Sequence, residues 1–218
     1  KRLDTRAQSL WNSLSKQPGS TISKLSSSRA EQVAYYRLLE NKKLSEQKLI
    51  HELTSRVSSL AAGRDLLCIE DSSEINVVAN ENRLQPDSGL GGSDNADNAT
   101  CFKIHPGLVL DAQSFNPLGF SAVKLFHRDE QPIEDKESYK WVEVSQSSKI
   151  TLAQSNSVTF VQDREGDIYE QFALIPDNKY HLLIRSRTTR CLWNGSDLYT
   201  AMQELPVAGI YTIEIPAD

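Results

Sequence analysis

Two aspartates each stand two residues after the end of a short apolar segment, at positions where carboxylates could do chemistry. Asp71 follows the apolar run 66–69 by way of Glu70, and Asp163 follows the run 158–161. Such runs predict buried strands, and sites in open α/β sheets form outside the carboxyl ends of the strands. Each aspartate alone would suit a helix cap or a turn, but the shared context favours a site formed by both.

The chemistry of such a pair is that of a divalent metal site. Two carboxylates at neighbouring strand ends repel, which raises their pKa values unless a cation lies between them. Mg²⁺ suits that position because it takes oxygen ligands and keeps water molecules that a phosphate can replace. Two such ions about 4 Å apart can activate a water molecule and stabilise the leaving oxygen. Asp71 and Asp163 are therefore the predicted catalytic residues and metal ligands.

Further charged residues surround these positions. Glu165 and Asp167 come just after Asp163, and we interpret them as the first turn of the next helix, where carboxylates favour the helix dipole. Arg164 suits either a phosphate contact or an ion pair with a neighbouring acid. Three arginines follow another predicted strand and suit a phosphate backbone, although a solvated charged face would look the same: Arg185, Arg187 and Arg190.

Charge is distributed unevenly along the 218 residues, whose net charge is −5. Residues 1–60 hold 11 Lys and Arg against 5 Asp and Glu, whereas residues 61–135 hold 5 against 13. A basic segment beside an acidic one is typical of a DNA-binding module next to a carboxylate site, and compositional drift is the alternative. The basic candidates for DNA contacts in the first segment are Arg6, Arg37, Lys42 and Lys43.

Other classes of site find little support. The three cysteines show no C-x-x-C spacing and the four histidines are scattered, so we predict reduced thiols and no zinc site. Neither a membrane-spanning apolar run nor a secretory signal is evident. Because the sequence starts with Lys1 rather than Met, we expect it to be a piece of a longer protein.

The elements that must position these residues fall into two parts. Apolar spacing predicts helices over 3–14, 29–40 and 46–62, with Ser28 and Ser45 as caps. Residues 1–62 are thus predicted to form a small all-helical DNA-binding domain. The remaining residues predict strands at 66–69, 75–79, 102–110, 122–126, 158–161, 181–184 and 211–215, helices at 137–152, 168–174 and 197–205, and loops at 80–100 and 116–119.

The order of the elements after residue 62 indicates a fold. With the short segment 75–79 left out of the count, three leading strands are followed by alternating helices and strands, an order typical of a ribonuclease-H-like α/β mixed sheet with flanking helices. Residues 63–218 are predicted to form this core.

Several motifs in the same order resemble the IS-four family of DDE transposases. They are A-Y-Y-R-L-L-E-N (34–41), L-L-C-I-E-D-S-S (66–73), E-S-Y-K-W (137–141), D-R-E-G-D-I-Y-E (163–170), the basic run 185–190 and G-I-Y-T-I-E-I-P (209–216). Ser72 and Ser73 replace the two threonines that usually follow the family's first aspartate. The resemblance covers nearly the whole chain.

The resemblance implies a helical domain that binds transposon ends and a core that cleaves DNA, forms hairpins and transfers strands. Its DDE triad uses Mg²⁺ or Mn²⁺, and Asp71 and Asp163 match the first two members. The third, a glutamate in a Y-x-x-x-R-x-x-E-like motif, has no match in residues 164–218. We therefore expect an incomplete catalytic core that is inactive alone. The implied partners are double-stranded DNA at transposon ends and targets, and a second copy in a homodimer of the full-length enzyme, in the bacterial cytoplasm at the nucleoid.

Two alternatives stay open. The chain could be a naturally truncated regulator that binds transposon ends or the full-length transposase without catalysis, or a small stand-alone nuclease of ribonuclease-H-like fold. The coding region after Asp218 separates the fragment from the regulator. An open frame with a Y-x-x-x-R-x-x-E motif supports the first, and a stop codon supports the second.

Overall fold

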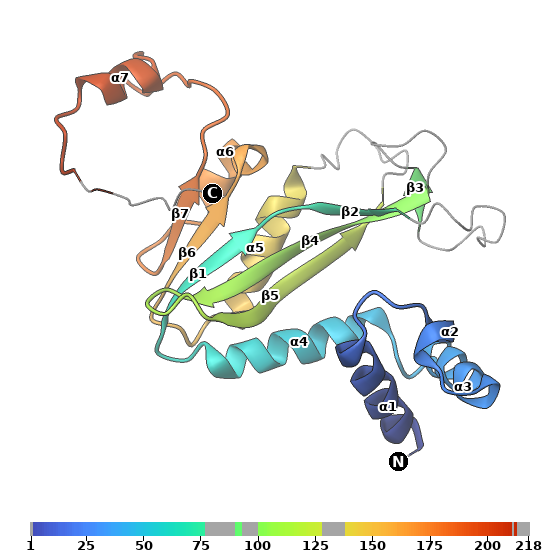
Figure 1. The fold of residues 1–218 in the computed structure, drawn as a ribbon. Coiled ribbons are helices and arrows are strands. Elements are labelled where there is room, and N and C mark those ends of the chain that lie inside the picture. The colour runs from blue at the N-terminus through green and yellow to red at the C-terminus, as the bar shows by residue number, and fades with distance from the viewer. Residues whose placement is uncertain (1, 77–89, 93–99, 128–137, 211, 213–218) are drawn as a thin grey trace.

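The computed structural model describes residues 2–76, 90–92, 100–127, 138–210 and 212. These form a small helical unit, residues 2–44, which we call the head, and an α/β unit that follows it (Figure 1). Each has its own apolar core. Among the described residues, no helix is long and apolar enough to cross a membrane.

The head contains helices α1 (Arg2–Lys16), α2 (Ile22–Leu25) and α3 (Arg29–Leu39). Ser28 caps α3, as predicted, and its side chain accepts a hydrogen bond from the amide of Glu31. The core of the head is built from Leu10, Leu25, Tyr35 and Leu38. Helix α2 lies between the predicted helices 3–14 and 29–40, where no helix was predicted because a single turn is too short to show helical periodicity.

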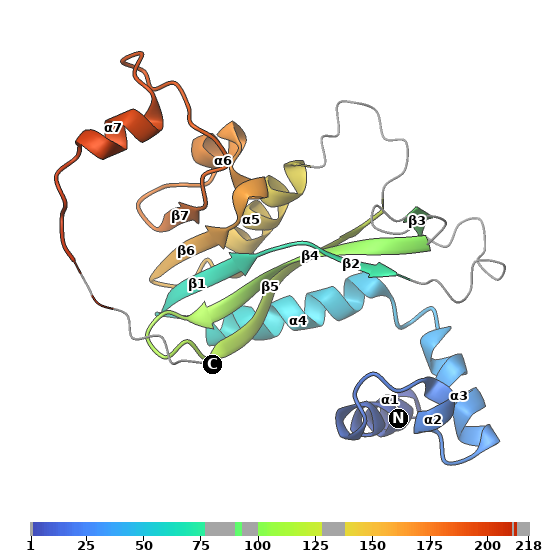
Figure 2. The same ribbon diagram turned by 45° about the horizontal axis from the view of Figure 1, so that its top comes forward.

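Helix α4 (Glu46–Leu60) begins after the predicted cap Ser45 but packs on the sheet. Val57 and the following Ala61 are buried in the core of the α/β unit. At Gly119, with φ of +133°, an added Cβ would come 2.7 Å from Val57, so this strand approaches the helix closely. The proposed domain division at residues 62 and 63 groups α4 with the head, whereas its apolar face contacts the sheet and the head lies beyond its N-terminal end (Figure 2).

The sheet is organised around the long strand β4 (Thr100–Asp111). Strands β1 (Asp65–Glu70) and β2 (Ser73–Asn76) pair with it antiparallel, as do β3 (Gly91–Gly92) and β5 (Pro117–Phe126). Strand β6 (Ser157–Gln162) pairs parallel with β1, and β7 (Tyr180–Ile184) pairs parallel with β6. The order β5-β4-β1-β6-β7 confirms the predicted ribonuclease-H-like mixed sheet, with three antiparallel strands followed by two parallel ones.

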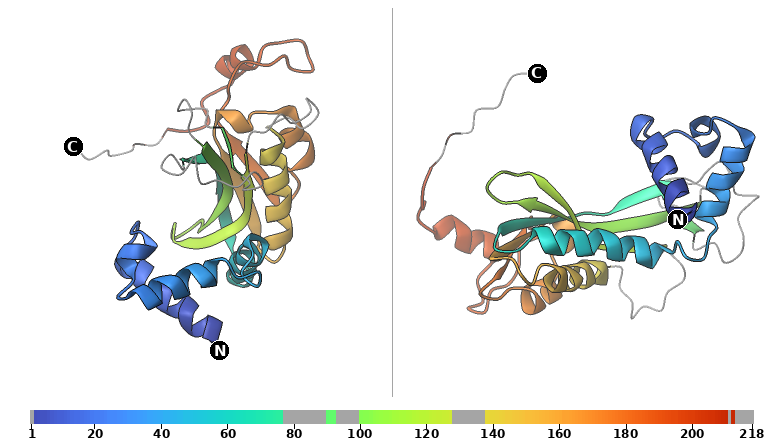
Figure 3. Two further views of the ribbon diagram at one scale, coloured as in Figure 1. Left: turned by 90° about the vertical axis from the view of Figure 1, so that its right-hand side faces the viewer. Right: turned by 90° about the horizontal axis from the view of Figure 1, so that it is seen from below.

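One face of the sheet is covered by helices. Helices α4 and α5 (Tyr139–Thr151) lie side by side beneath it (Figure 3), with α6 (Tyr169–Leu174) packed next to α5. The core between the layers contains Leu66, Cys68, Val109, Val142, Leu152, Val158 and Phe160. The other face of β7 carries Leu183, which is 62% exposed. We call the first face the helical face and the second the open face.

The predicted elements differ from the structure mainly at β5. Residues 116–119 were predicted to be a connection because they contain Pro117 and Gly119, but β5 begins at Pro117. Proline is tolerated at the first position of a strand and glycine at a bulge, and the β4–β5 register shifts here. Helix α7 (Leu198–Glu204) confirms the prediction over 197–205. Most of the predicted strand at 211–215 and most of the predicted loop at 80–100 lie outside the described residues. The ends of two further predicted elements, 77–79 and Glu137, also lie outside them.

Candidate metal and DNA-binding site

The two aspartates follow neighbouring parallel strands at the same level. The β1–β6 register pairs Ile69 with Val161, and the strands end one residue later, at Glu70 and Gln162. Continuing the register by one further step sets Asp71 opposite Asp163. Neighbouring strands lie about 4.8 Å apart, a backbone separation that suits carboxylates sharing metal ions about 4 Å apart.

The alternation of side chains assigns both aspartates to the open face. In β1 the buried residues are Leu66, Cys68 and Glu70, and in β6 they are Val158, Phe160 and Gln162. Side chains alternate between faces along a strand, so continuing this alternation one residue past each strand end assigns Asp71 and Asp163 to the open face. Both aspartates are exposed. The pair thus has access to solvent, whereas the residues just before it are buried.

Each carboxylate is held by a backbone amide. Asp71 Oδ1 accepts from the Ser72 amide at 2.7 Å, and Asp163 Oδ1 accepts from the Glu165 amide at 2.8 Å. Asp163 is the N-cap of the short 3₁₀ helix η2 (Arg164–Gly166). The cap interpretation of Asp163 is therefore correct, and it is compatible with metal binding because the second oxygen can still be a ligand.

Arg185 follows the next strand, β7, at the same level as the two aspartates. The β6–β7 register pairs Gln162 with Ile184, and the Arg185 amide donates to the Gln162 carbonyl at 3.1 Å. One step further, Arg185 lies opposite Asp163 and belongs to the open face. Arg185 and Arg187 are exposed, as is Arg164 at the start of η2. The extended register thus sets Arg185 next to Asp163 along the strand ends.

Arg190 has a different environment. Its guanidinium forms an ion pair with Asp167 and donates to the Asp167 carbonyl at 2.6 Å. It also lies 4.8 Å and 5.1 Å from the ring centroids of Tyr169 and Phe172. Its side chain is only 15% exposed and that of Asp167 only 3%. These contacts give Arg190 a structural role in anchoring the segment after β7.

The acids after Asp163 also have specific partners, where the sequence indicated only a helix dipole. Asp167 accepts from Arg190 and from the Arg187 amide at 2.7 Å. Glu165 lies in η2, and its carboxylate is 3.2 Å from the ammonium group of the buried Lys140. The helix-dipole interpretation used only neighbouring residues. It could not predict Arg190 and Lys140 as partners because they are distant along the chain.

A buried polar cluster under the aspartates was not predicted. Glu70 is 1% exposed, and burial raises its pKa to about 8, an effect that hydrogen bonds from Ser145 and Gln162 partly offset. His105 lies beside it, and burial, followed by the charges of Lys140 and Lys124, lowers its pKa to about 3. The sequence did carry one signal of this burial. Glu70 is an even number of residues from Leu66 and Cys68, so it shares their face of β1.

The predicted basic residues of the head lie on its surface. Arg37 is exposed on α3, Lys42 and Lys43 are exposed in the turn that follows it, and Arg6 of α1 is half-buried. Because they extend from the surface, they are accessible to a phosphate backbone.

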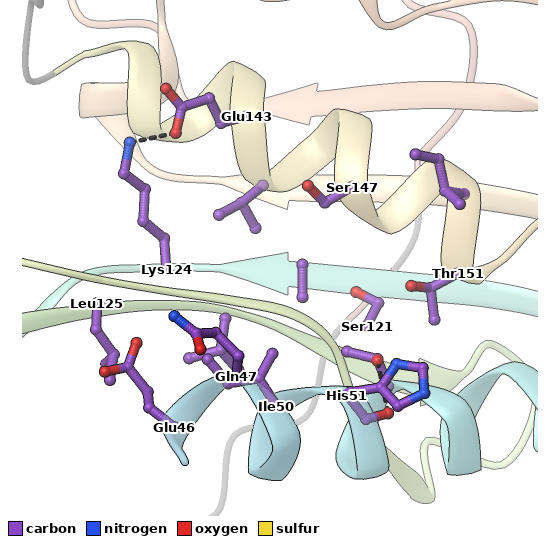
Figure 4. Close-up of a pocket in the computed structure, with 15 residues that line it drawn as sticks. Glu46, Gln47, Ile50, His51, Ser121, Lys124, Leu125, Glu143, Ser147 and Thr151 are labelled. Carbon is purple, nitrogen blue, oxygen red and sulfur yellow. Dashed lines mark hydrogen bonds and ion pairs between the residues drawn. The ribbon is translucent and has the colours of Figure 1, made fainter.

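The pocket in Figure 4 lies away from the aspartates. It has a volume of about 620 Å³ and is bounded by α4, β5 and α5. The figure shows Lys124 of β5 paired with Glu143 of α5 across it. Strand β4 separates this edge of the sheet from β1 and β6.

The donor chemistry of the aspartate pair fits Mg²⁺ or Mn²⁺. Both ions accept carboxylate oxygens and retain water or phosphate oxygens as their other ligands. The described residues contain no group of three or more His, Cys, Asp and Glu side chains that could hold a metal ion. Two carboxylates alone give an open site.

Comparison with known proteins identifies the head. Residues 1–44 match the family model Tnp_DNA_bind, described as transposase DNA-binding. The first 44 residues therefore resemble the DNA-binding segment of transposases. All four predicted basic residues of the head, Arg6, Arg37, Lys42 and Lys43, fall within the matched segment. No curated protein matches the sequence significantly.

Solved transposase structures show weaker likeness. A piggyBac transposase synaptic complex with hairpin DNA has 11% identity and a TM-score of 0.42, covering 85% of this chain and 42% of that one. A Mos1 transposase paired-end complex with the left transposon end has 14% identity and a TM-score of 0.33, covering 84% and 59%. A Mos1 mariner paired-end complex with Mn has 12% identity and a TM-score of 0.31, covering 89% and 63%. This chain thus spans less than two thirds of each, and its fold assignment rests on its own strand order.

Proposed function

We propose that this chain is the DNA-binding and first catalytic-core portion of a DDE transposase of the IS-four type, which cleaves and joins DNA at transposon ends. The observation that carries the proposal is the common level of Asp71 and Asp163 after neighbouring parallel strands. The match of the head to transposase DNA-binding domains supports it independently.

In this proposal the aspartates are metal ligands. Mg²⁺ or Mn²⁺, when bound, supplies positive charge to the phosphate and lowers the pKa of an attacking water molecule. Asp71 and Asp163 would hold the ions on the open face, each with Oδ1 oriented by a backbone amide. A third carboxylate, which the family resemblance implies, would complete the site. We therefore expect weak metal binding and no DNA cleavage by residues 1–218 alone.

The basic residues position DNA. Arg185 belongs to the same face as Asp163, so its guanidinium suits the phosphate next to the scissile bond. Arg187 and Arg164 extend the basic surface, and the head supplies Arg6, Arg37, Lys42 and Lys43 for the transposon end. In the complete enzyme, the proposal includes a homodimer that holds two ends.

Metal binding is tested by titrating Mn²⁺ and monitoring the amide NMR signals. We expect selective broadening of the amide signals near Asp71 and Asp163, and its loss in both Asp71→Asn and Asp163→Asn. The matched control is Asp65→Asn, because Asp65 lies at the opposite end of β1, where it accepts from Ser157 and Asn156. Broadening that survives Asp71→Asn, or robust metal-dependent cleavage by that variant, would refute the assignment of the site.

The DNA arm measures duplex binding across a salt series. Removing one side chain that binds a phosphate should reduce the slope of log affinity against log salt by about 0.9. We expect Arg185→Ala with Arg187→Ala to reduce it, and removal of residues 1–44 to reduce affinity for transposon ends. A slope and affinity unchanged in the arginine double variant would make these arginines a solvated face only.

A further inference from the structure

The residues that directly precede the two aspartates are joined to each other inside the protein. Glu70 and Gln162 are the last residues of β1 and β6 and stand opposite each other in the extended register. Both are buried and belong to the helical face. Glu70 Oε2 accepts from Gln162 Nε2 at 2.8 Å. A side-chain hydrogen bond thus connects the two strand ends that precede Asp71 and Asp163.

Ser145 of α5 ties the helical layer to the same bond. Its hydroxyl donates to Glu70 Oε1 at 2.9 Å and lies 3.2 Å from Gln162 Nε2. It also accepts from Gln171 Nε2 of α6 at 3.0 Å. Helices α5 and α6 and strands β1 and β6 therefore meet at one fully buried hydroxyl.

The residue that follows Asp71, Ser72, contacts a buried histidine beside Glu70. Ser72 Oγ lies 2.9 Å from Nδ1 of the buried His105 of β4, and His105 Nε2 is 3.7 Å from Glu70 Oε2. The His105 ring packs against Trp141 in a T-shaped arrangement, with centroids 4.4 Å apart. Both neighbours of Asp71 in the chain are thus fixed by buried side chains.

Gly166 brings the turn after Asp163 onto the same cluster. A Cβ at Gly166 would come 2.5 Å from Gln162 Oε1 and 2.9 Å from Gln162 Cβ. Only glycine leaves room for Gln162 under the 3₁₀ helix that Asp163 caps. The turn that carries Asp163 therefore rests directly on the side chain that Glu70 holds.

Stability alone does not account for this cluster. Burying polar groups costs free energy, and apolar side chains of similar volume often replace such groups without loss. Within the described part of the chain, His105 Nε2, Gln162 Oε1 and Gln171 Oε1 have no hydrogen-bond partner. Unsatisfied buried atoms of this kind each cost about 1–3 kcal/mol. The location of the cluster directly beneath both aspartates provides the explanation.

We propose that Glu70 is a positioning residue which, through Gln162 and Ser145, fixes the two strand ends so that Asp71 and Asp163 can share divalent metal ions. The proposal rests on the metal site of the proposed function. Residues behind metal ligands typically contribute 10–100-fold to metal affinity, because productive sites tolerate displacements of only about 0.5 Å.

The test compares two serines of one helix. Ser145 and Ser148 are both fully buried on α5, but Ser148 contacts Cys68 and Ser121 rather than the cluster. We expect Ser145→Ala to weaken Mn²⁺ binding about 10–100-fold, and Ser148→Ala to leave it unchanged at a similar loss of stability. Equal weakening in both variants would overturn the proposal, because it would indicate general destabilisation.

Glu70 itself is tested with a pair of substitutions. Glu70→Leu should weaken Mn²⁺ binding by a similar factor, whereas Glu70→Gln should restore it, since an amide flip at Gln162 can rebuild the bond between the strand ends. Wild-type affinity in Glu70→Leu would refute the positioning role.

A metal-free measurement separates failure of this proposal from failure of the proposed function. The amides of Ser72 and Glu165 bond to the two aspartates, so their hydrogen exchange reports on the order of both turns. Ser145→Ala should accelerate both, and Ser148→Ala neither. If the wild type binds no Mn²⁺ but hydrogen exchange responds to Ser145→Ala and not to Ser148→Ala, the positioning role is supported and the metal site is refuted. If Mn²⁺ binds the wild type and neither measurement responds to Ser145→Ala, the positioning role falls.

Discussion

Replacing Arg190 by alanine tests whether this arginine holds the fold together or binds DNA. Its guanidinium pairs with Asp167 and lies over the rings of Tyr169 and Phe172. Removing it leaves the Asp167 carboxylate, 3% exposed, with the Arg187 amide as a remaining donor. The segment between β7 and α7 thus loses its anchor on α6.

The magnitude follows from the burial of the pair. Breaking a buried ion pair by removing one partner costs about 3–5 kcal/mol. The 15% exposure of Arg190 and the remaining amide donor reduce that cost, whereas removal of the two cation–π interactions adds about 0.5–1 kcal/mol each at exposed sites. We expect Arg190→Ala to lower the free energy of unfolding by about 2–4 kcal/mol.

Urea unfolding measures this change through the transition midpoint. The control is Arg187→Ala, which removes an exposed side chain and keeps the backbone amide, so its effect should stay within about 0.5 kcal/mol. In the double variant with Asp167→Ala, the two destabilising effects should be less than additive because the residues contact each other. If Arg190→Ala unfolds like Arg187→Ala and instead reduces the salt slope of DNA binding, the structural assignment of Arg190 is wrong.

Three other changes test the packing and electrostatics of the fold. Gly107→Ala should lower the free energy of unfolding by about 1–3 kcal/mol, because the added Cβ would come 2.8 Å from the buried Ser121 hydroxyl. The control is Gly209→Ala, which has open space around it and should cost far less in the same urea experiment. Since the folded-state pKa of Glu70 is raised from 4.5 to about 8, stability should fall as pH rises between these values; a Glu70→Gln variant with the same pH dependence in thermal unfolding would contradict this. Ser28→Ala removes the cap of α3 and should cost the head about 1 kcal/mol, visible by circular dichroism; an unchanged melting temperature would argue against the cap.

The sequence predicted the elements well where local signals act alone. Ser28 and Ser45 marked two helix starts because a capping hydroxyl satisfies an amide only three residues away. The apolar runs 66–69 and 158–161 predicted that Asp71 and Asp163 lie just after buried strands. The strand order then followed from the succession of elements, since short connections and right-handed crossovers leave few arrangements.

What the sequence did not predict depends on contacts between distant residues. The apolar residues of α4 predicted a helix. They did not predict that Val57 would pack against Gly119 of β5. Arg190 looked like a phosphate ligand because its partner, Asp167, lies 23 residues away. Glu70 looked like the polar end of a strand, and only its shared face with Leu66 and Cys68 indicated burial.

The separation of the two aspartates along the chain affects how the site is assembled. Strand β1 pairs with β4 across 37 to 45 positions, whereas β6 pairs with β1 across 92 positions. Closing the longer loop costs more chain entropy, and contacts between distant residues slow folding. During synthesis Asp71 therefore emerges, and its strand can pair with β4, well before Asp163 exists. The two aspartates come to lie opposite each other only when the parallel strands pair. Under the proposed function, an unfinished chain therefore lacks the paired carboxylates that a metal ion would need.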